Sequence, residues 1–262
     1  IRQSLDAVRN YTALWKEPVE RLTGKIIRRS VEKTKHLSNA SRNYMLYGLR
    51  KAFAYAEEQG FVTQNPTQGI KTFPERPRKL DLPTDKQFGE LVDLLRHPEG
   101  KSEGEQGRPE VAFTFLFLCF TGLRMGEARA AKWKDLDGAT MIIRGTKTKA
   151  AFRYVPVIRQ LSELFGEMKA FRGELHPDQT IMRRKRIDKP IRVACDKLGL
   201  PRLRHHDLRH YFATKAIQSG VDVPTVAKWL GHNDGGVLAM KVYANVIDEH
   251  SRAQAAKLVF PE

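Results

Sequence analysis

The chain has 262 residues, with 46 Lys+Arg against 30 Asp+Glu, which gives a formal net charge of +16. Its content of 41% hydrophobic and 29% charged residues is typical of folded proteins and argues against wholesale disorder. The longest apolar run, VAFTFLFLCF at 111–120, is about half of the roughly 20 residues that a membrane-spanning helix needs. We therefore expect no transmembrane segment and no membrane partner.

The positive charge is spread over both halves of the chain. Residues 1–75 carry 13 Lys+Arg against 7 Asp+Glu, and residues 76–262 carry 33 against 23. This distribution favours two basic bodies that bind one polyanion together, and double-stranded nucleic acid is the leading candidate. A basic protein without such a partner is the alternative.

The N-terminus and the cysteines indicate the compartment. Residues 1–10, IRQSLDAVRN, carry charges where a signal peptide would have its apolar core, and the chain begins with Ile. We expect a cytoplasmic protein, and a fragment or a processed chain. Cys119 and Cys195 are too few for a disulfide framework or a cysteine-rich zinc module, so we expect both thiols to be reduced.

The first third of the chain predicts a small helical domain. Apolar residues recur at spacings of three and four over 39–60, and Gly60 suits the position after a helix end. The segment before this helix lacks strand alternation, and we assign residues 1–72 to the domain. Prolines are frequent between 65 and 83 and disfavour a helix there, so we predict a linker at 73–83.

Residues 84–262 predict a second domain of mixed structure. Thr84 suits a helix N-cap, and the run at 111–120 is apolar on all sides, as in a buried helix. Residues 140–157 show partial alternation and predict a β-hairpin, after which helical spacing returns. No repeated βαβ pattern is visible. The predicted fold is mainly α with a small antiparallel β-sheet: an N-terminal helical bundle followed by a mixed α+β domain.

Four polar clusters stand out in the second domain. They are TGLRMGE at 121–127, GTKTKAAFRYVPV at 145–157, HHDLRH at 205–210 and LGHNDGGVLAMKVYANV at 231–247. Arg124 follows an apolar run, so it needs an anion, either a ligand or a structural partner such as Glu127 or Asp135. His206 and Arg209 share a helix face because they are three residues apart; a satisfied core histidine beside a surface arginine is the alternative.

In this order after a helical domain, the clusters resemble the tyrosine recombinases, the phage-integrase type of site-specific DNA recombinase. The resemblance covers the whole second domain as the catalytic domain, and residues 39–66 resemble the SAM-like core-binding domain that precedes it in that family. It implies an enzyme that cleaves and rejoins DNA through a covalent 3′-phosphotyrosyl intermediate, without a metal or ATP. The implied role is the integration or excision of a phage or another mobile element.

The resemblance also implies roles for individual basic residues. The family's two active-site arginines correspond to Arg124 and Arg209, whose planar guanidinium groups suit the non-bridging oxygens of a scissile phosphodiester. The hairpin lysine of the family corresponds to Lys147, which would protonate the departing 5′ oxygen. Lys149 is its rival, since it would point to the same face of a strand.

His206 and His232 resemble the family's two active-site histidines, and Tyr243 resembles the nucleophile. A phenol has a pKa of about 10, so Tyr243 needs a neighbouring base or cations to lose its proton. Tyr211 and Tyr154 are rival tyrosines that we expect to pack in the core. The pattern HHxxxH at 205–210 would suit zinc, but no cysteine lies nearby and we expect no metal site.

The resemblance implies as partners a double-stranded DNA attachment or core site, a homotetramer assembled on it, and accessory DNA-bending proteins, in the cytoplasm of a bacterial host and associated with the nucleoid. The C-terminal segment after Tyr243 would dock on a neighbouring protomer or on its own domain. Two other classes remain: a DNA-binding regulator that does not cleave, and a type IB topoisomerase with the same chemistry. The residues expected to contact DNA are Lys33, Lys35, Arg42, Arg50, Lys149 and Arg184.

Overall fold

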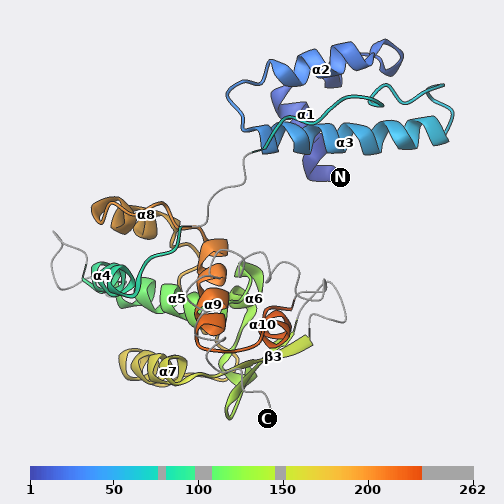
Figure 1. The fold of residues 1–262 in the computed structure, drawn as a ribbon. Coiled ribbons are helices and arrows are strands. Elements are labelled where there is room, and N and C mark those ends of the chain that lie inside the picture. Colours follow the sequence, from blue (N-terminus) through green and yellow to red (C-terminus); the bar gives the residue numbers. More distant parts are fainter. Residues whose placement is uncertain (76–80, 98–107, 145–151, 232–262) are drawn as a thin grey trace, which may run out of the picture. The chain divides into compact units, whose positions relative to one another are not determined.

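The computed structural model describes residues 1–75, 81–97, 108–144 and 152–231. The chain divides into two compact units, Ile1–Lys79 and Leu80–Glu262, and each is described by itself. Helices dominate both units, and the second also contains a three-stranded antiparallel sheet (Figure 1). The predicted mainly α fold with a small antiparallel sheet is confirmed.

The first unit is built around one long helix. Its helices are α1 (Arg2–Tyr11), α2 (Gly24–Glu32) and α3 (Asn39–Glu58), with 3-10 turns η1 (Leu14–Lys16) and η2 (Val19–Arg21) between α1 and α2. The Ser38 hydroxyl caps α3 by accepting the N–H of Ser41 at 3.1 Å. The helix ends two residues before Gly60, so the helix predicted at 39–60 is confirmed.

The core of the first unit lies between α3 and the two shorter helices. Helices α1 and α2 both pack against α3. Gly48 permits a close approach, because a Cβ atom there would lie 2.6 Å from Oγ of Ser4 on α1. The buried side chains at spacings of three and four on α3, together with those of α2, are Met45, Leu46, Leu49, Phe53, Ile27 and Val31.

The second unit is arranged around α5 (Figure 1). Its helices are α4 (Asp85–Arg96), α5 (Arg108–Thr121), α6 (Met125–Ala130), α7 (Arg159–Arg172), α8 (Asp188–Lys197), α9 (His205–Gln218) and α10 (Val223–Leu230). Thr84 and Gln87 form a capping box at the start of α4, as the sequence predicts for Thr84. Helix α5 packs against α4, α7 and α9, and Phe115, Phe117 and Leu118 are buried, so the predicted buried helix is confirmed.

The sheet consists of β1 (Leu136–Asp137), β2 (Thr140–Arg144) and β3 (Phe152–Pro156), after the 3-10 turn η3 (Trp133–Asp135). Strands β2 and β3 are the predicted hairpin, whose connection at 145–151 lies outside the described residues. The prediction that Tyr154 packs in the core is wrong, since the residue is 52% exposed. Alternation along β3 instead turns Arg153 and Val155 inward, opposite Ile143 and Met141.

Two further sequence expectations concern membrane and thiol chemistry. Within the described ranges, no helix has both the length and the apolar character needed to cross a bilayer. Cys119 and Cys195 are buried free thiols. Burial raises the pKa of the Cys119 thiol well above its ordinary value, which keeps this thiol protonated and unreactive.

The close contact at Gly48 gives a stability prediction. Gly48→Ala should destabilise the first unit by about 1–3 kcal/mol, because the new methyl group overlaps Ser4. Gly166→Ala in α7 is the matched control: apart from its sequence neighbours and the helix's own backbone, no atom lies within 4 Å of its added Cβ, so the helix should gain up to about 1 kcal/mol. Native-state hydrogen exchange of α3 and α7 amides measures both changes. Unaltered exchange in α3 of Gly48→Ala would contradict this packing.

Candidate active site

The turn between α5 and α6 brings the Arg124 segment against α9 and α10. Gly122 has φ +61°, a backbone conformation that favours glycine. A Cβ atom at Gly122 would lie 2.6 Å from the Phe212 ring and 2.8 Å from Leu230. The chain can therefore pass closely over these two helices, and it places Arg124 at the N-cap position of α6.

Arg124 is held at both its backbone and its side chain. Its N–H donates to Oε2 of Glu127 at 2.9 Å, and its Nη1 lies 3.2 Å from Oε1 of the same carboxylate. Its Nη2 donates to the Gly231 carbonyl oxygen at 3.0 Å. The Glu127 ion pair that the sequence offered as an alternative is thus present, whereas Asp135 pairs with Arg144. The Arg124 side chain remains 48% exposed, so its guanidinium can still receive a ligand.

Arg209 is buried behind Arg124. It is 3% exposed, and its Nη1 and Nη2 donate to the carbonyl oxygens of Gly122 at 2.8 Å and Leu230 at 2.6 Å. Among the described residues, no carboxylate forms an ion pair with it. Burial, and secondly the charge of Arg124, lower the pKa of Arg209 to about 9. Arg209 therefore stays charged at neutral pH, with no neutralising contact from the described part of the chain.

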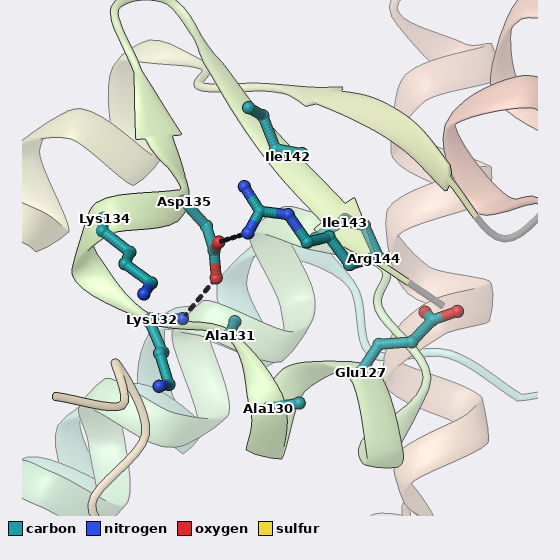
Figure 2. Close-up of a pocket in the computed structure, with 9 residues that line it drawn as sticks. All are labelled: Glu127, Ala130, Ala131, Lys132, Lys134, Asp135, Ile142, Ile143 and Arg144. Carbon is teal, nitrogen blue, oxygen red and sulfur yellow. Dashed lines mark hydrogen bonds and ion pairs between the residues drawn. The ribbon is translucent and has the colours of Figure 1, made fainter. Parts of the chain in front are cut away.

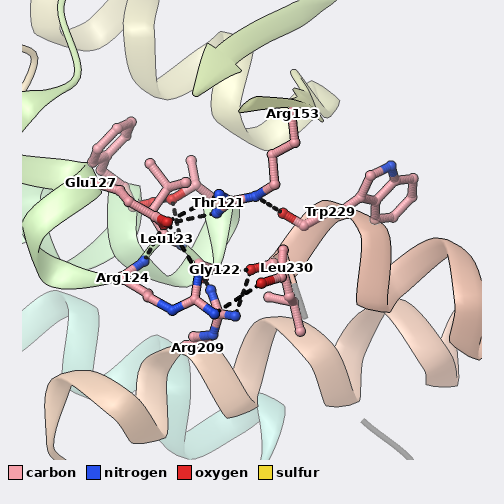
Figure 3. A network of polar contacts seen from close by, with 11 residues as sticks. Thr121, Gly122, Leu123, Arg124, Glu127, Arg153, Arg209, Trp229 and Leu230 are labelled. Atoms are coloured by element: carbon pink, nitrogen blue, oxygen red, sulfur yellow. Dashed lines mark hydrogen bonds and ion pairs between the residues drawn. The ribbon is translucent and has the colours of Figure 1, made fainter. Parts of the chain in front are cut away.

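The end of α10 is the meeting point of the site (Figure 3). Gly231 ends this helix in the left-handed conformation, and the last carbonyl oxygens of a helix have no partners within it. Three arginines from different parts of the second unit donate hydrogen bonds to these carbonyl oxygens. The pairs are Arg153 with Trp229, Arg209 with Leu230, and Arg124 with both Leu230 and Gly231.

Arg153 is not among the residues that the sequence predicts for the site, and Glu127 is predicted only as an alternative partner of Arg124. Nη1 and Nη2 of Arg153 donate to Oε1 and Oε2 of Glu127 at 3.0 and 2.8 Å, and Nε donates to the Trp229 carbonyl oxygen at 2.6 Å. Burial raises the pKa of Glu127, but the Arg153 hydrogen bonds and the Arg124 backbone and charge outweigh it, so its pKa is lowered. Strand alternation puts Arg153 on the face opposite to Phe152 and Tyr154, but it does not show which of the two faces is buried.

His206 lies in the first turn of α9, on the same helix as Arg209. Its ring contacts His210 edge to face, with centroids 4.7 Å apart. Burial, then the charges of Arg209 and Arg124, lower the pKa of His206 despite an opposing effect of Asp207. The imidazole is therefore neutral at pH 7 and able to accept a proton. Within the described residues, no group of three His, Cys, Asp or Glu side chains is arranged to hold a metal ion.

Tyr243, Lys147, Lys149 and His232 lie outside the described residues. Strand β2 ends at Arg144 and β3 begins at Phe152, so the two lysines belong to the connection of the hairpin. His232 directly follows Gly231 in the sequence. The structure therefore brings together three of the six expected catalytic residues, which are Arg124, His206 and Arg209.

The rival nucleophile Tyr211 packs in the core, as the sequence predicts. It is buried, and its ring stacks on that of Phe88 with centroids 4.6 Å apart. Burial raises the pKa of its phenol, which disfavours the phenolate that attack on phosphorus requires.

The expected DNA-contact residues of the first unit differ in their surroundings. Lys33 and Lys35 are exposed. Nε and Nη2 of Arg42 donate to the Thr34 carbonyl oxygen at 3.1 and 3.0 Å, and Arg50 donates to the Ile70 carbonyl oxygen. Both arginines thus stabilise the unit's own backbone, and a contact of either with DNA stays a prediction.

Arg184 belongs to an exposed basic segment, 183–186, in the second unit. Arg129 donates to the Lys185 carbonyl oxygen at 2.8 Å, and Arg183 lies 3.9 Å from Glu110. The segment is therefore attached to the body of the unit at two points.

A cavity of about 270 Å³, which Glu127 also lines, lies between α6, η3 and β2 (Figure 2). Its cationic side chains already have acidic partners: Arg144 pairs with Asp135, and Lys132 and Lys134 pair with Asp178. The balanced charge distinguishes this cavity from the cluster of Arg124, Arg153 and Arg209.

Comparison with known proteins identifies the family. The phage integrase family matches residues 89–250, so the chain belongs to it. The ICEBs1 integrase of Bacillus subtilis (strain 168) is 26% identical over 253 residues, which cover 85% of this chain and 66% of that protein. A XerC-like tyrosine recombinase of Caldanaerobacter subterraneus subsp. tengcongensis is 25% identical over 248 residues, 76% of this chain and 60% of that protein. The chain thus spans just under two thirds of the length of these relatives.

Solved structures of integrases share the fold. The Tn1549 transposon integrase, in complex with transposon right end DNA, has a TM-score of 0.71 at 17% identity and covers 92% of this chain and 87% of its own. A lambda integrase tetramer bound to a Holliday junction has a TM-score of 0.72 at 19% identity and covers 92% and 69%. The second unit therefore has the fold of tyrosine recombinase catalytic domains.

The arginine cluster gives a prediction for His206. Arg124→Gln should raise the pKa of His206, because one of the positive charges that oppose its protonation is removed. NMR titration of the His206 ring proton measures this change. Arg144→Gln is the control, since Arg144 is also exposed and pairs with Asp135 instead. Identical His206 titrations in wild type and Arg124→Gln would show that the two groups are not coupled.

Proposed function

We propose that this protein is a site-specific DNA recombinase that cleaves and rejoins DNA through a 3′-phosphotyrosyl intermediate, without a metal or ATP. The observation that carries the proposal is the buried Arg209, which is bonded to backbone carbonyl oxygens and adjoins the half-exposed Arg124. With Arg153 and Glu127, the cluster has three cations and one anion among the described residues. Such an excess favours a phosphodiester ligand at its open side.

The same two arginines suit the reaction. In phosphoryl transfer, negative charge accumulates on the non-bridging oxygens, and fixed guanidinium groups stabilise it without reorganising. Attack by the Tyr243 oxygen on phosphorus forms the phosphotyrosyl bond and breaks the bond to the 5′ oxygen, which leaves as a hydroxyl after it receives a proton. In the second step, a 5′-hydroxyl attacks the same phosphorus and the tyrosine leaves. Each step exchanges one phosphodiester for another, so no ATP is consumed.

Chain connectivity supports the remaining assignments. We propose Lys147 of the hairpin connection as the acid, with Lys149 as its rival, and His206, neutral at pH 7, as the proton acceptor for Tyr243 or a donor to the phosphate. His232 follows Gly231, whose carbonyl oxygen binds Arg124, and we assign it to the phosphate as well.

The relatives support a role in DNA integration. The curated relatives are an integrase and tyrosine recombinases, and the solved neighbours include a tetramer on a Holliday junction and an integrase on transposon end DNA. We propose a duplex core site as the substrate, a homotetramer as the active assembly, DNA-bending proteins as accessory partners, and the bacterial cytoplasm as the location. The reaction would integrate or excise a phage or another mobile element.

The nucleophile has a direct test. Selection from random duplexes yields a binding site, and a nicked version of that site in EDTA should form a covalent adduct with wild type but not with Tyr243→Phe. Tyr154→Phe removes an exposed tyrosine of β3 and is the matched control that should retain the adduct. Adduct formation by Tyr243→Phe would refute the assignment. Tight binding without any adduct in wild type would favour a regulator, and relaxation of supercoiled DNA without the site would favour a topoisomerase.

Salt should weaken DNA binding steeply, because binding releases counterions from the phosphates. Between about 50 and 200 mM NaCl, we expect an affinity loss of about 10³-fold in wild type and equally in Tyr243→Phe. The double variant Lys33→Gln/Lys35→Gln should reduce the slope of log K against log salt by about 2. Lys86→Gln, an exposed lysine paired with Glu90, should leave the slope unchanged. Fluorescence anisotropy measures all four proteins, and a slope near zero would contradict phosphate-dominated binding.

A further inference from the structure

We propose that Arg153 is a positioning residue of this site, which keeps Glu127 occupied so that the Arg124 guanidinium remains available to the scissile phosphate. The inference rests on the proposed function and adds a residue that does not itself contact the DNA. Arg153 is buried, with a side chain that is 4% exposed. Its effect on the reaction would therefore pass through its neighbours.

The first neighbour is the carboxylate that Arg124 also contacts. Arg153 binds both oxygens of Glu127 at 3.0 and 2.8 Å, whereas Arg124 has one side-chain contact with it at 3.2 Å. Glu127 is thus shared between a buried arginine with the better geometry and an exposed arginine with the poorer one. If Arg153 were absent, the full charge of Glu127 would fall on Arg124. The carboxylate would then compete with the phosphate for the same guanidinium.

The second neighbour is the end of α10. Nε of Arg153 donates to the Trp229 carbonyl oxygen, while Arg209 and Arg124 bind the next two carbonyl oxygens. A Cβ atom on Gly231 would lie 3.1 Å from Cδ, Cζ and Nη1 of Arg153. The guanidinium is therefore packed against the backbone that leads directly to His232. Arg153 joins three segments in this way: β3, the first turn of α6 and the end of α10 (Figure 3).

The role requires the planar fork of arginine. Three donors of Arg153 point in fixed directions to two carboxylate oxygens and one carbonyl oxygen. A lysine has the charge but not the fork, so it cannot bind both oxygens of Glu127 and the Trp229 carbonyl together. Arg153→Lys preserves the charge and changes the geometry, which makes it the informative substitution.

The chain provides a matched control in Arg172. Its side chain is 0% exposed, it binds both oxygens of Glu110, and its Nη1 donates to the Ile181 carbonyl oxygen at 2.9 Å. Arg172 is therefore as buried and as fully bonded as Arg153, but it pairs with a carboxylate that none of Arg124, His206 and Arg209 contacts. A loss of cleavage activity that reflects fold stability alone should be similar in Arg153→Lys and Arg172→Lys.

The experiment measures adduct formation at saturating protein on the nicked selected site, well below the unfolding temperature of each variant. We expect Arg153→Lys to slow the single-turnover rate by about 10- to 100-fold, as for a misplaced catalytic group, with DNA affinity little changed. Arg172→Lys should stay within about twofold of wild type. Equal rates in Arg153→Lys and Arg172→Lys would overturn the inference and leave the proposed function intact. Failure of wild type to form any adduct would instead refute the proposed function.

A second variant separates competition from structural support. In Arg153→Met, the freed Glu127 charge should suppress cleavage. Adding Glu127→Gln to this variant should raise the cleavage rate at least about tenfold over Arg153→Met alone, because the competitor for Arg124 is then neutral. The double variant does not leave the Glu127 charge without its Arg153 partner, so it should fold even where Arg153→Met does not. The comparison requires that the double variant is folded by circular dichroism. If it then forms the adduct no faster than Arg153→Met, the competition is refuted. Where Arg153→Met does not fold, Arg153→Lys takes its place in this comparison.

Discussion

The site depends on the last carbonyl oxygens of α10. These acceptors carry a partial negative charge and lack intrahelical partners, so they can bind guanidinium groups without neutralising them. Arg124, Arg153 and Arg209 come from the start of α6, from β3 and from α9, and all three meet at this helix end. Glu127 also contacts two of the arginines, Arg124 and Arg153, but the carbonyl oxygens do not neutralise the remaining positive charge that a phosphate needs.

The surrounding core makes this accumulation of charge tolerable. Arg209 lies on α9, which packs against the mostly apolar α5 and against α10, and the turn at Gly122 supplies one of its two acceptors. The close approach of Gly122 to Phe212 and Leu230 fixes the distance between the two arginine segments. Mutual repulsion between Arg124 and Arg209 is therefore opposed by packing. Burial, and secondly the charge of Arg124, lower the pKa of Arg209, and a bound anion would oppose this shift.

Much of the fold can be predicted from the sequence for simple reasons, and so can the positions of Arg124 and Arg209 next to each other. Helices α3 and α5 have clear apolar periods, and Arg124 and Arg209 lie in recognisable motifs. The phase of β3 could not be predicted, because a buried arginine has the sequence signature of an exposed one. The pattern favoured Tyr154 as the inward residue, whereas the inward position belongs to Arg153, whose burial depends on a carboxylate 26 positions earlier. Strand β1 has two residues, too few to show any alternation.

The net charge of +16 is likewise an incomplete guide to where DNA is contacted. Arg42 and Arg50 of the first unit, like Arg209 of the second, donate to backbone carbonyl oxygens, so their donors are partly used within the fold. A carbonyl oxygen does not cancel the charge, however, and these arginines still contribute to the field that attracts a polyanion. Charge that steers DNA towards the protein and donors that hold it thus belong to partly different residues. The composition indicates the charge that attracts DNA. The hydrogen-bond partners of each arginine show which donors are still available to hold it.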